Sequence, residues 1–401
     1  MSTSIIKPIS TTADLGGFWE ILAGSEGYYP NAKDGRLKWF KKLSKEVLTY
    51  YGVFREGNMV GGMAIADFEV NVRMAMVKLS SVGMVHTDIL HKKEKVCKDM
   101  MEYFIGMNRE KGVNLLTLTP FRPEFYRQMG FGYGSCLYQY RIPPLSFPDS
   151  GSKDGLHYLG AERKQDYLDC VARISRKTHG MIRPFRLVTG PFGDGCRVLA
   201  YERNGEMKGV LAYSFPRDRE MTIEEMHYGD TETLHAFCSF LHSQSDNFDR
   251  ILFQTPDAHF YYLLRDPTNG TGPVECCTSA IHNMFRVIHV PGIFAELRDV
   301  SFNDQNTVIE VAMRDTLYPQ NAGSTVVEFR NGHPIVHSNY TGTIDARLAL
   351  DVSDFSSLLM GSIGVRALHR LGLSKIQSER EVDLLDRVFS YGQMPLSEGG
   401  L

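Results

Sequence analysis

The stretch Phe125–Gly132 (FYRQMGFG) constrains the fold of this chain more than any other. It is typical of a short helical turn that ends at Gly130, a residue that tolerates a left-handed backbone, and is followed at once by a strand. An apolar run of the buried-strand type, Val113–Thr119, precedes it, and the alternating segment Tyr133–Ile142 predicts a strand after it. The sequence therefore predicts a strand–helix–strand unit, in which Tyr126 is either a core aromatic or a functional residue.

Composition and charge exclude several classes of function. With 401 residues, of which 43% are hydrophobic and 23% charged, the chain is long enough for two or three globular domains. A formal net charge of -3 gives no excess of positive charge for binding nucleic acid or an anionic membrane. No apolar run is long enough to span a bilayer. The seven cysteines form no CxxC pair and there is no signal peptide, so we expect reduced thiols in a cytoplasmic protein without a metal site.

The residues before the first clear linker predict one mixed domain. In chain order we expect a strand, two helices, three antiparallel strands and a long helix ahead of Phe125. These elements are expected at Ile5–Ile9, Asp14–Leu22, Leu37–Leu43, Val47–Phe54, Met59–Phe68, Arg73–Met84 and Lys92–Asn108. The segment Pro143–Gly155 (PPLSFPDSGSKDG) is rich in turn residues and predicts a linker, so the first domain is expected at residues 1–150.

Two further domains are expected after the linker. Residues 151–291 repeat much of the same order of elements without an FYxxxGF stretch, and we expect the strand His282–Val290 to close this second domain. From Gly292 onward four strands precede three helices, a pattern that predicts an α+β domain over residues 292–401. The strands of this last domain are expected at Val308–Met313, Ser324–Phe329, Ile335–Ser338 and Ala346–Leu350, and its helices at Asp354–Met360, Ser362–Leu371 and Glu379–Phe389.

The order of elements and several short stretches resemble the Eis (enhanced intracellular survival) family of GNAT N-acetyltransferases across essentially the whole chain. The matching landmarks are FYRQMGFGYG, Phe285–Gly292 (FRVIHVPG), Leu350–Val352 and Leu358–Gly361. The resemblance implies a mixed α/β (α+β) chain with two tandem GNAT acyl-CoA N-acyltransferase domains and a sterol-carrier-protein-like C-terminal domain. It also implies a homohexamer that transfers acetyl from acetyl-CoA to a primary amine of a small molecule, such as a polyamine or aminoglycoside, or of a lysine side chain.

The resemblance also implies the two groups that move protons. Tyr126 is the expected general acid, since a phenol with a reference pKa of about 10 stays protonated at neutral pH and can donate to the leaving thiolate. The carboxylate of Leu401, the last residue, is the expected general base. A carboxylate with a reference pKa of about 3.5 is a weak base in water, and burial would strengthen it.

The donor site is expected where the strands near Val82–Thr87 and Leu115–Thr119 separate, because this frees backbone N–H groups for pantetheine and for the developing oxyanion. The helix expected to begin near Lys92 would face the pyrophosphate. The predicted cofactor-binding residues are Met84, Val85, His86, Thr87, Lys92, Lys93, Glu94, Lys95, Val96, Cys97, Lys98, Phe121 and Arg122.

One segment departs from the family pattern. The phosphate loop of acetyltransferases usually reads (Gln/Arg)-x-x-Gly-x-(Gly/Ala), whereas this chain has Lys92–Cys97 (KKEKVC), with Lys95 in place of the glycine. Basic side chains could still bind phosphate, or the segment could be a solvated first helical turn. The alternative function is therefore a non-catalytic binding protein, in which the last domain holds a lipid-like ligand in an apolar cavity.

Three residues are candidates for binding the acceptor amine. Glu26 falls between the first two expected helices, Trp39 lies at the start of the second, and Glu398 is three residues from the chain end. Carboxylates and an indole suit a polycationic amine through charge pairing and cation–π contact. Each of them could equally be an ordinary surface or core residue.

Overall fold

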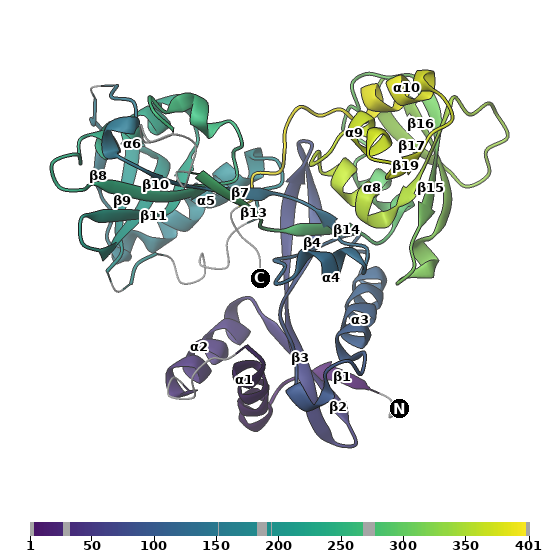
Figure 1. Ribbon diagram of the computed structural model, residues 1–401, viewed down its shortest axis with the longest axis horizontal. Helices are drawn as coiled ribbons and strands as arrows, with labels where there is room; N and C mark the ends of the chain where they lie inside the picture. The colour runs from purple at the N-terminus through teal and green to yellow at the C-terminus, as the bar shows by residue number, and fades with distance from the viewer. Residues whose placement is uncertain are drawn as a thin grey trace. The chain divides into compact units, whose positions relative to one another are not determined.

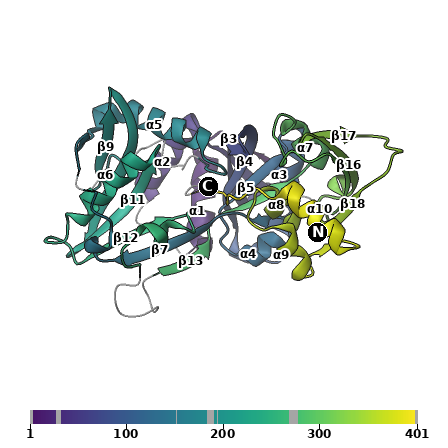
Figure 2. The same cartoon turned by 90° about the horizontal axis from the view of Figure 1, so that it is seen from above.

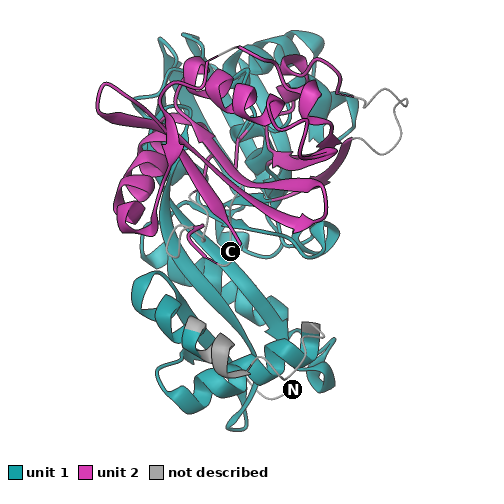
Figure 3. Ribbon diagram, turned by 90° about the vertical axis from the view of Figure 1, so that its left-hand side faces the viewer, with its two compact units in different colours: residues 1–134, 283–394, 400–401 teal, residues 135–282, 395–399 magenta. Residues whose placement is uncertain are grey.

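The computed structural model describes residues 4–26, 33–150, 152–182, 191–193, 195–267 and 277–397, without the side chains of residues 26, 33–37 and 39. The chain forms two compact units (Figure 3). The first comprises residues 1–134 and 283–394, and the second comprises residues 135–282 with the segment that begins at residue 395. Each unit is described below by itself.

The first unit contains a seven-stranded sheet (Figure 1). Its strands, in spatial order, are β1 (Ile5–Pro8), β2 (Thr49–Arg55), β3 (Asn58–Val72), β4 (Ala75–Thr87), β5 (Leu115–Leu118), β14 (Met284–Val287) and β6 (Gly132–Tyr133). Only β4 and β5 pair in parallel. The helices of this part are α1 (Thr12–Glu26), α2 (Lys33–Glu46), α3 (Val96–Glu110) and α4 (Pro123–Arg127), with the 3-10 helix η2 (Ile89–His91) before α3.

Local sequence accounts for these helices. Thr11 and Asp14 exchange hydrogen bonds across the first turn of α1, where the Thr11 hydroxyl accepts from the Asp14 N–H at 3.1 Å. The apolar face predicted for α3 is buried at Val96, Met100 and Phe104, since these positions recur at helical spacing. Helix α3 begins at Val96, four residues later than the predicted start at Lys92.

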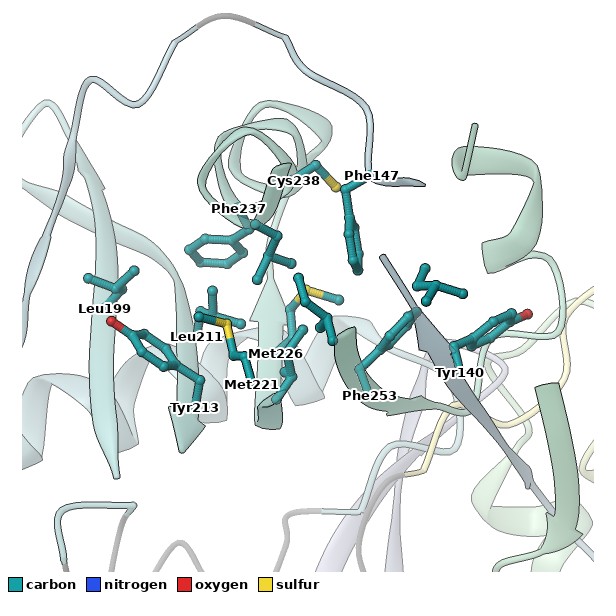
Figure 4. Packing of buried hydrophobic residues seen from close by; sticks show 14 of the residues in the cluster. Tyr140, Phe147, Leu199, Leu211, Tyr213, Met221, Met226, Phe237, Cys238 and Phe253 are labelled. Carbon is teal, nitrogen blue, oxygen red and sulfur yellow. The ribbon is translucent and has the colours of Figure 1, made fainter. Parts of the chain in front are cut away.

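The second unit contains another seven-stranded sheet, covered on opposite faces by two helices. Its strands, in spatial order, are β13 (Cys277–Ile281), β7 (Cys136–Ile142), β12 (Arg250–Thr255), β11 (Glu220–Tyr228), β10 (Glu206–Arg217), β9 (Arg197–Arg203) and β8 (Leu156–Tyr158), and its helices are α5 (Lys164–Lys177) and α6 (Thr231–His242). Figure 4 shows Phe237 of α6 above Leu211 and Met221, with Phe253 alongside. Val210 and Ala212 belong to the cluster beneath α5, because successive side chains of a strand point to opposite faces.

The two sheets exchange strands. We expected Tyr133–Ile142 to follow the signature in the first domain, but β7 lies in the second sheet, between β12 and β13. We expected His282–Val290 to close the second domain, but β14 lies in the first sheet, between β5 and β6. The ladder continues through the crossing, where Gly134 N donates to Asn283 O and His282 N donates to Ser135 O, both at 2.9 Å. Each sheet is therefore completed by a strand from the other half of the chain.

The C-terminal part of the first unit has the predicted four strands ahead of its last three helices, with one short strand that was not predicted, Ser374–Lys375, between the last two helices. Its sheet is β17 (His333–His337), β16 (Gly323–Arg330), β15 (Thr307–Arg314), β18 (Ala346–Asp351) and β19 (Ser374–Lys375). Helix α7 (Val290–Glu296) leads into it, and α8 (Val352–Leu359), α9 (Val365–Arg370) and α10 (Glu379–Phe389) lie beside it (Figure 2). Its interior is filled by aromatic rings 5.2–6.4 Å apart between centroids, from Phe294, Phe302, Phe329, Phe355 and Phe389.

Helix α8 packs directly on the signature stretch. A Cβ added at Gly132 would overlap the carbonyl oxygen of Ser353, and one added at Gly130 would overlap Arg286 and Val352. The Arg127 guanidinium pairs with Asp354 of α8 at 2.6 Å. The two glycines of the signature are therefore required by close packing, and Gly130 also by its φ of 82°. No helix among the described residues is both long and apolar enough to cross a membrane.

We predict that Gly132→Ala lowers the free energy of unfolding by about 1–3 kcal/mol or more, because the backbone of α8 would have to move to admit one methyl group. The shift of the urea midpoint measures this loss. Gly106→Ala is the matched control, since Gly106 lies in α3 with open space around it and alanine favours a helix by about 0.5–1 kcal/mol. Equal midpoints for Gly132→Ala and the wild type would contradict the close approach.

Candidate active site

The strands β4 and β5 separate where the sequence predicted that they would. They pair only from Leu79 to Val82 on β4, after which β4 continues to Thr87 with β3 as its only partner strand among the described residues. In this stretch β4 bulges, since Met84 and Val85 together oppose the single residue Met63 of β3. Met84 has a left-handed φ of 50°. A bulge of this kind leaves a backbone N–H outside the ladder, where it is available to a ligand oxygen.

His86 stabilises the bulge from within the core. It is 3% exposed and lies edge-on to Phe18 of α1, with the ring centroids 4.4 Å apart. Burial lowers the pKa of His86 to about 4, so the ring is neutral at pH 7. Because a carbonyl can only accept, the Nδ1 atom must donate to Met84 O at 2.8 Å. Its Nε2 atom has no hydrogen-bond partner within the described part of the chain.

Two glycines of β3 let the neighbouring elements approach. A Cβ at Gly61 would lie 2.6 Å from His86 O and 3.2 Å from the side chain of Val96, the first residue of α3. A Cβ at Gly62 would lie 2.6 Å from the Phe18 ring. The pair therefore permits both the bulge and the start of α3 to pack against β3.

The segment between β4 and α3 keeps the backbone conformation of a glycine loop without containing glycine. Lys93 and Lys95 have φ values of 68° and 65°, in the left-handed region. Lys95 is the N-cap of α3 and makes no side-chain cap hydrogen bond. The first N–H groups of α3, from Val96, Cys97 and Lys98, therefore remain available to an anion at the positive end of the helix dipole.

A buried arginine of β2 fixes this loop. Arg55 is 8% exposed, and its guanidinium donates to the Glu94 carboxylate at 2.9 Å and to the Glu94 carbonyl at 3.1 Å. It also bonds the Asp99 carboxylate at 3.3 Å, in the first turn of α3. Hydrogen bonds from His91 and Arg55 lower the pKa of Glu94. The Glu94 side chain is thus engaged with its own protein, and it positions the loop rather than facing an anionic ligand.

The structure separates the predicted loop residues into two groups. Lys92, Lys93, Lys95 and Lys98 are all exposed at the start of α3, where they add positive charge to the free N–H groups. The Val96 side chain is buried, and burial raises the pKa of Cys97 to about 12, so its thiol is neutral. Val96 and Cys97 can therefore contribute only their backbone N–H groups to a phosphate.

The signature helix α4 follows β5 at the same sheet edge. Tyr126 is 8% exposed and contacts Phe131, with the ring centroids 6.1 Å apart. Phe121, on the loop before α4, is 90% exposed, and Arg122 pairs with Glu124 at 2.7 Å. The loop after β4 likewise exposes Leu90. Because β4 and β5 are parallel, their following loops start at one edge and place these apolar side chains there.

Several predicted residues lie outside the described part of the chain. Leu401 and Glu398 are beyond residue 397, and the side chains of Glu26 and Trp39 are not described. In the backbone, Glu26 is the last residue of α1, whereas Trp39 lies within α2 instead of opening it. The tail before Glu398 is held in the second unit, where Leu396 N donates to His179 O at 2.9 Å and Ser397 O accepts from the Ser135 hydroxyl at 3.0 Å.

Among the described residues of the second unit, the connection between β11 and α6 does not have the corresponding anion-binding features. Strand β11 ends at Tyr228 and α6 starts at Thr231, so only Gly229 and Asp230 connect them, compared with the eight residues 88–95 between β4 and α3. Asp230 caps α6, accepting from the Thr233 N–H at 2.8 Å. The carboxylate occupies the helix end to which a phosphate would bind in the first sheet.

Sequence reasoning predicted α8 as a helix at Asp354–Met360, but it missed the packing of that helix on the signature stretch, the role of Arg55 and the link between His86 and the bulge. The Gly61-Gly62 pair inside a predicted strand was the one signal for close backbone approach. Arg55 at a strand end and Asp354 far along the chain carry no local pattern, because their roles depend on long-range contacts. Within the described residues, no group of three His, Cys, Asp or Glu side chains could hold a metal ion.

Comparisons with known proteins agree with this geometry. Family models for an acetyltransferase (GNAT) domain match residues 10–134 and 183–287, and the model of a sterol carrier protein domain matches residues 290–397. No curated protein sequence matches the chain. GNAT domains generally use acetyl-CoA.

Several solved structures share the whole fold. A probable N-acyltransferase of unknown function from Enterococcus faecalis V583 is 18% identical, with full coverage of both chains and a TM-score of 0.84. A GCN5-related N-acetyltransferase from Anabaena variabilis is 15% identical, covering 98% of this chain and 99% of its own, with a TM-score of 0.82. Eis1 from Mycobacterium abscessus is 17% identical, with full coverage of both chains and a TM-score of 0.79. At these identities the likeness concerns the fold.

We predict that Lys95→Gly binds coenzyme A as tightly as the wild type or more tightly. Glycine adopts the φ of 65° without the cost of about 1–2 kcal/mol that a side chain incurs there, and the N–H donors stay in place. Lys95→Ala is the matched control, because it keeps the backbone cost and removes the charge, and it should bind more weakly. Calorimetry gives both affinities. A loss of about tenfold in Lys95→Gly would mean that the ammonium itself carries the binding.

We predict that His86 makes the first unit lose stability in acid. Burial lowers the pKa of folded His86 to about 4 from the usual histidine pKa of about 6.5, so the unfolded chain takes up the proton first as pH falls. The contribution of neutral His86 to the free energy of unfolding is fully present above pH 6.5. It decreases by up to about 3 kcal/mol as the pH falls towards 4. His86→Asn, which keeps a donor for Met84 O without titrating, should lose less stability between pH 7 and pH 4 in urea unfolding. If both proteins lose the same amount, the prediction is wrong; the exposed His333→Asn is the control.

Proposed function

We propose that this Eis-like N-acetyltransferase, with two GNAT domains and a sterol carrier protein domain, transfers acetyl from acetyl-CoA to a primary amine of a small polycationic molecule. The start of α3 carries the proposal. Free helical N–H groups, exposed lysines and a loop held by Arg55 form an anion site beside the bulge of β4. These features fit the phosphates and the acyl oxygen of an acyl-CoA, whereas α6 of the second sheet is capped by Asp230. We therefore assign the cofactor to the first GNAT domain alone.

Each group of the chain has one proposed role. Bound acetyl-CoA supplies an acetyl group activated as a thioester. The backbone N–H groups released by the bulge at Met84 and Val85 donate hydrogen bonds to the acyl oxygen, on which negative charge develops. The Tyr126 hydroxyl gives its proton to the departing sulfur, and the carboxylate of Leu401 takes a proton from the amine. Hydrogen bonds hold the tail as far as Ser397 in the second unit.

The acceptor class follows from the charge expected around it. We propose that Glu26, Trp39 and Glu398 bind the acceptor, since carboxylates and an indole select a molecule with several ammonium groups. By resemblance to the Eis family we also propose a homohexamer in the cytoplasm. Polyamines, aminoglycosides and lysine side chains are all of the proposed acceptor class.

A non-catalytic lipid-binding protein is the alternative. Two observations favour the enzyme over this alternative. Phenylalanine rings pack together between the C-terminal sheet and its helices, where a lipid-like ligand would have to lie. The loop at Lys93 and Lys95 also keeps its left-handed conformation despite its unusual sequence. Calorimetry with acetyl-CoA separates the two functions, since only the enzyme requires the cofactor to bind.

We predict that Tyr126→Phe reduces kcat by about 10²–10⁴-fold while the affinity for acetyl-CoA stays within about threefold of the wild type. The substitution removes only the hydroxyl that donates the proton, and the ring still packs against Phe131. Steady-state assays with a polyamine acceptor measure kcat, and calorimetry measures affinity. Tyr103→Phe, on α3, is the matched control and should keep full activity. A kcat for Tyr126→Phe within about threefold of the wild type would make Tyr126 a packing residue.

We predict that two residues added after Leu401 abolish acetyl transfer without changing the thermal unfolding midpoint. The extension moves the terminal carboxylate away, and a base must lie within about 2.6–3.2 Å, or one water, of the proton it takes. Two residues added before Met1 are the matched control and should leave the rate unchanged. Full activity of the C-terminally extended protein would remove the Leu401 carboxylate from the mechanism.

A further inference from the structure

The bulge of β4 is accessible from outside the protein at two residues. Met84 and Val85 are half-buried, whereas Gly83 before them and His86 after them are buried. The ladder with β3 is regular up to Gly83 and resumes at His86. The peptide group that joins Met84 to Val85 is therefore the part of the bulge that a ligand can approach.

His86 holds one end of this peptide group. Its Nδ1 atom donates to Met84 O at 2.8 Å. No cis peptide bond is found among the described residues, and the carbonyl and N–H of a trans peptide lie in one plane and point in opposite directions. While the hydrogen bond from His86 is made, the Val85 N–H must therefore point away from the His86 ring.

The backbone of the bulge needs such a contact. Met84 has a left-handed φ of 50°, a conformation that is unfavourable for a residue with a side chain. Backbones of this kind persist where the surrounding structure holds them, and they are common at functional sites. The hydrogen bond to Met84 O supplies that hold from outside the backbone.

The His86 ring is itself fixed. It lies edge-on to Phe18 at 4.4 Å between centroids, and Gly62, which is opposite His86 on β3, leaves room for Phe18. Burial lowers the pKa of His86 to about 4, so at pH 7 the neutral ring carries one proton. That proton is on Nδ1, because Met84 O can only accept. The donor of this hydrogen bond therefore has one position and one tautomer.

The direction of the Val85 N–H suits the chemistry of acyl transfer. The acyl oxygen gains negative charge as the amine bonds to the thioester carbon, and it loses that charge when the carbon–sulfur bond breaks. A donor that already points at this oxygen does not have to reorient during the reaction. We propose that His86 is a positioning residue for acetyl transfer, which acts through Met84 O to direct the Val85 N–H at the acyl oxygen. This role rests on the proposed function, in which the amine proton goes to Leu401 and the thiolate takes its proton from Tyr126.

Two variants of the same shape test this role. Asparagine and leucine branch alike, so His86→Asn and His86→Leu leave the same space beside Phe18, and only asparagine keeps an N–H for Met84 O. In steady-state assays with a polyamine acceptor, kcat of His86→Leu should be about tenfold or more below that of His86→Asn. The limit is the 10²–10³-fold that loss of an oxyanion donor typically costs. The KM for acetyl-CoA should stay within about threefold.

Thermal unfolding separates this role from packing. Leucine suits a buried position better than asparagine, so His86→Leu should unfold at the same temperature as His86→Asn or higher. A residue that only packs would make the leucine variant at least as active as the asparagine variant. A positioning residue gives the opposite order, in which the more stable variant is the less active one.

A pair of ligands reports the acyl oxygen contact without turnover. S-Ethyl coenzyme A carries the same two carbons as acetyl-CoA but has no acyl oxygen. In calorimetry without an amine, the wild type and His86→Asn should bind acetyl-CoA about threefold or more tightly than S-ethyl coenzyme A, as one hydrogen bond allows. His86→Leu should bind both ligands equally, and its affinity for S-ethyl coenzyme A should stay within about twofold of the wild type.

The outcomes distinguish this role from the proposed function. Equal kcat values for the two variants would overturn the role of His86 and leave the proposed function intact. A full preference for acetyl-CoA in His86→Leu, or no preference in the wild type, would do the same. A wild type that binds neither ligand would overturn the proposed function, and this role with it.

Discussion

The structure of the first unit depends on one buried ion pair. Arg286 of β14 is fully buried and donates two hydrogen bonds to Asp315, each at 2.9 Å, after β15. The same guanidinium lies against Gly130, the turn of the signature stretch. Removing one partner of a buried pair typically costs about 3–5 kcal/mol, because the remaining charge is left without compensation. One side chain thus joins the exchanged strand, the signature turn and the C-terminal domain.

Through this contact the C-terminal domain takes part in shaping the proposed site. The Arg127–Asp354 pair and the close approach of Ser353 to Gly132 both act on the residues that flank Tyr126. Burial raises the pKa of Asp354, and the hydrogen bond and charge of Arg127 oppose that shift. Arg127 therefore favours the ionised form of the Asp354 carboxyl group. A sterol carrier fold packed with phenylalanine rings is suited to this supporting role. A close-packed interior deforms little, so it keeps the residues that contact it in fixed positions.

Local pattern in the sequence predicted most elements and little of their assembly. The alternation and helical spacing that identify β2, β3 and α3 are properties of neighbouring residues, and the FYRQMGF stretch indicated an acetyltransferase unit. Strand exchange is invisible to such reasoning, because Tyr133–Ile142 looks like a strand whichever sheet receives it. At Lys95 the sequence predicted too little, because a lysine argued against the backbone conformation of a glycine loop. The contacts of Arg55, Glu94 and Gly61 nevertheless hold the backbone in that left-handed conformation. The acceptor residues and the chain end stay predictions.

The strand exchange also determines when this protein can fold during its synthesis. β14 is a central strand of the first sheet, yet residues 284–287 leave the ribosome long after β5 and β6. Until then the nascent chain presents an unfilled gap beside β5, and unpaired strand edges promote aggregation. The second sheet, in contrast, receives β7 early and needs only the residues up to 281. The second sheet can therefore be completed first, and the first sheet is completed only when β14 has been synthesised, just before the C-terminal domain.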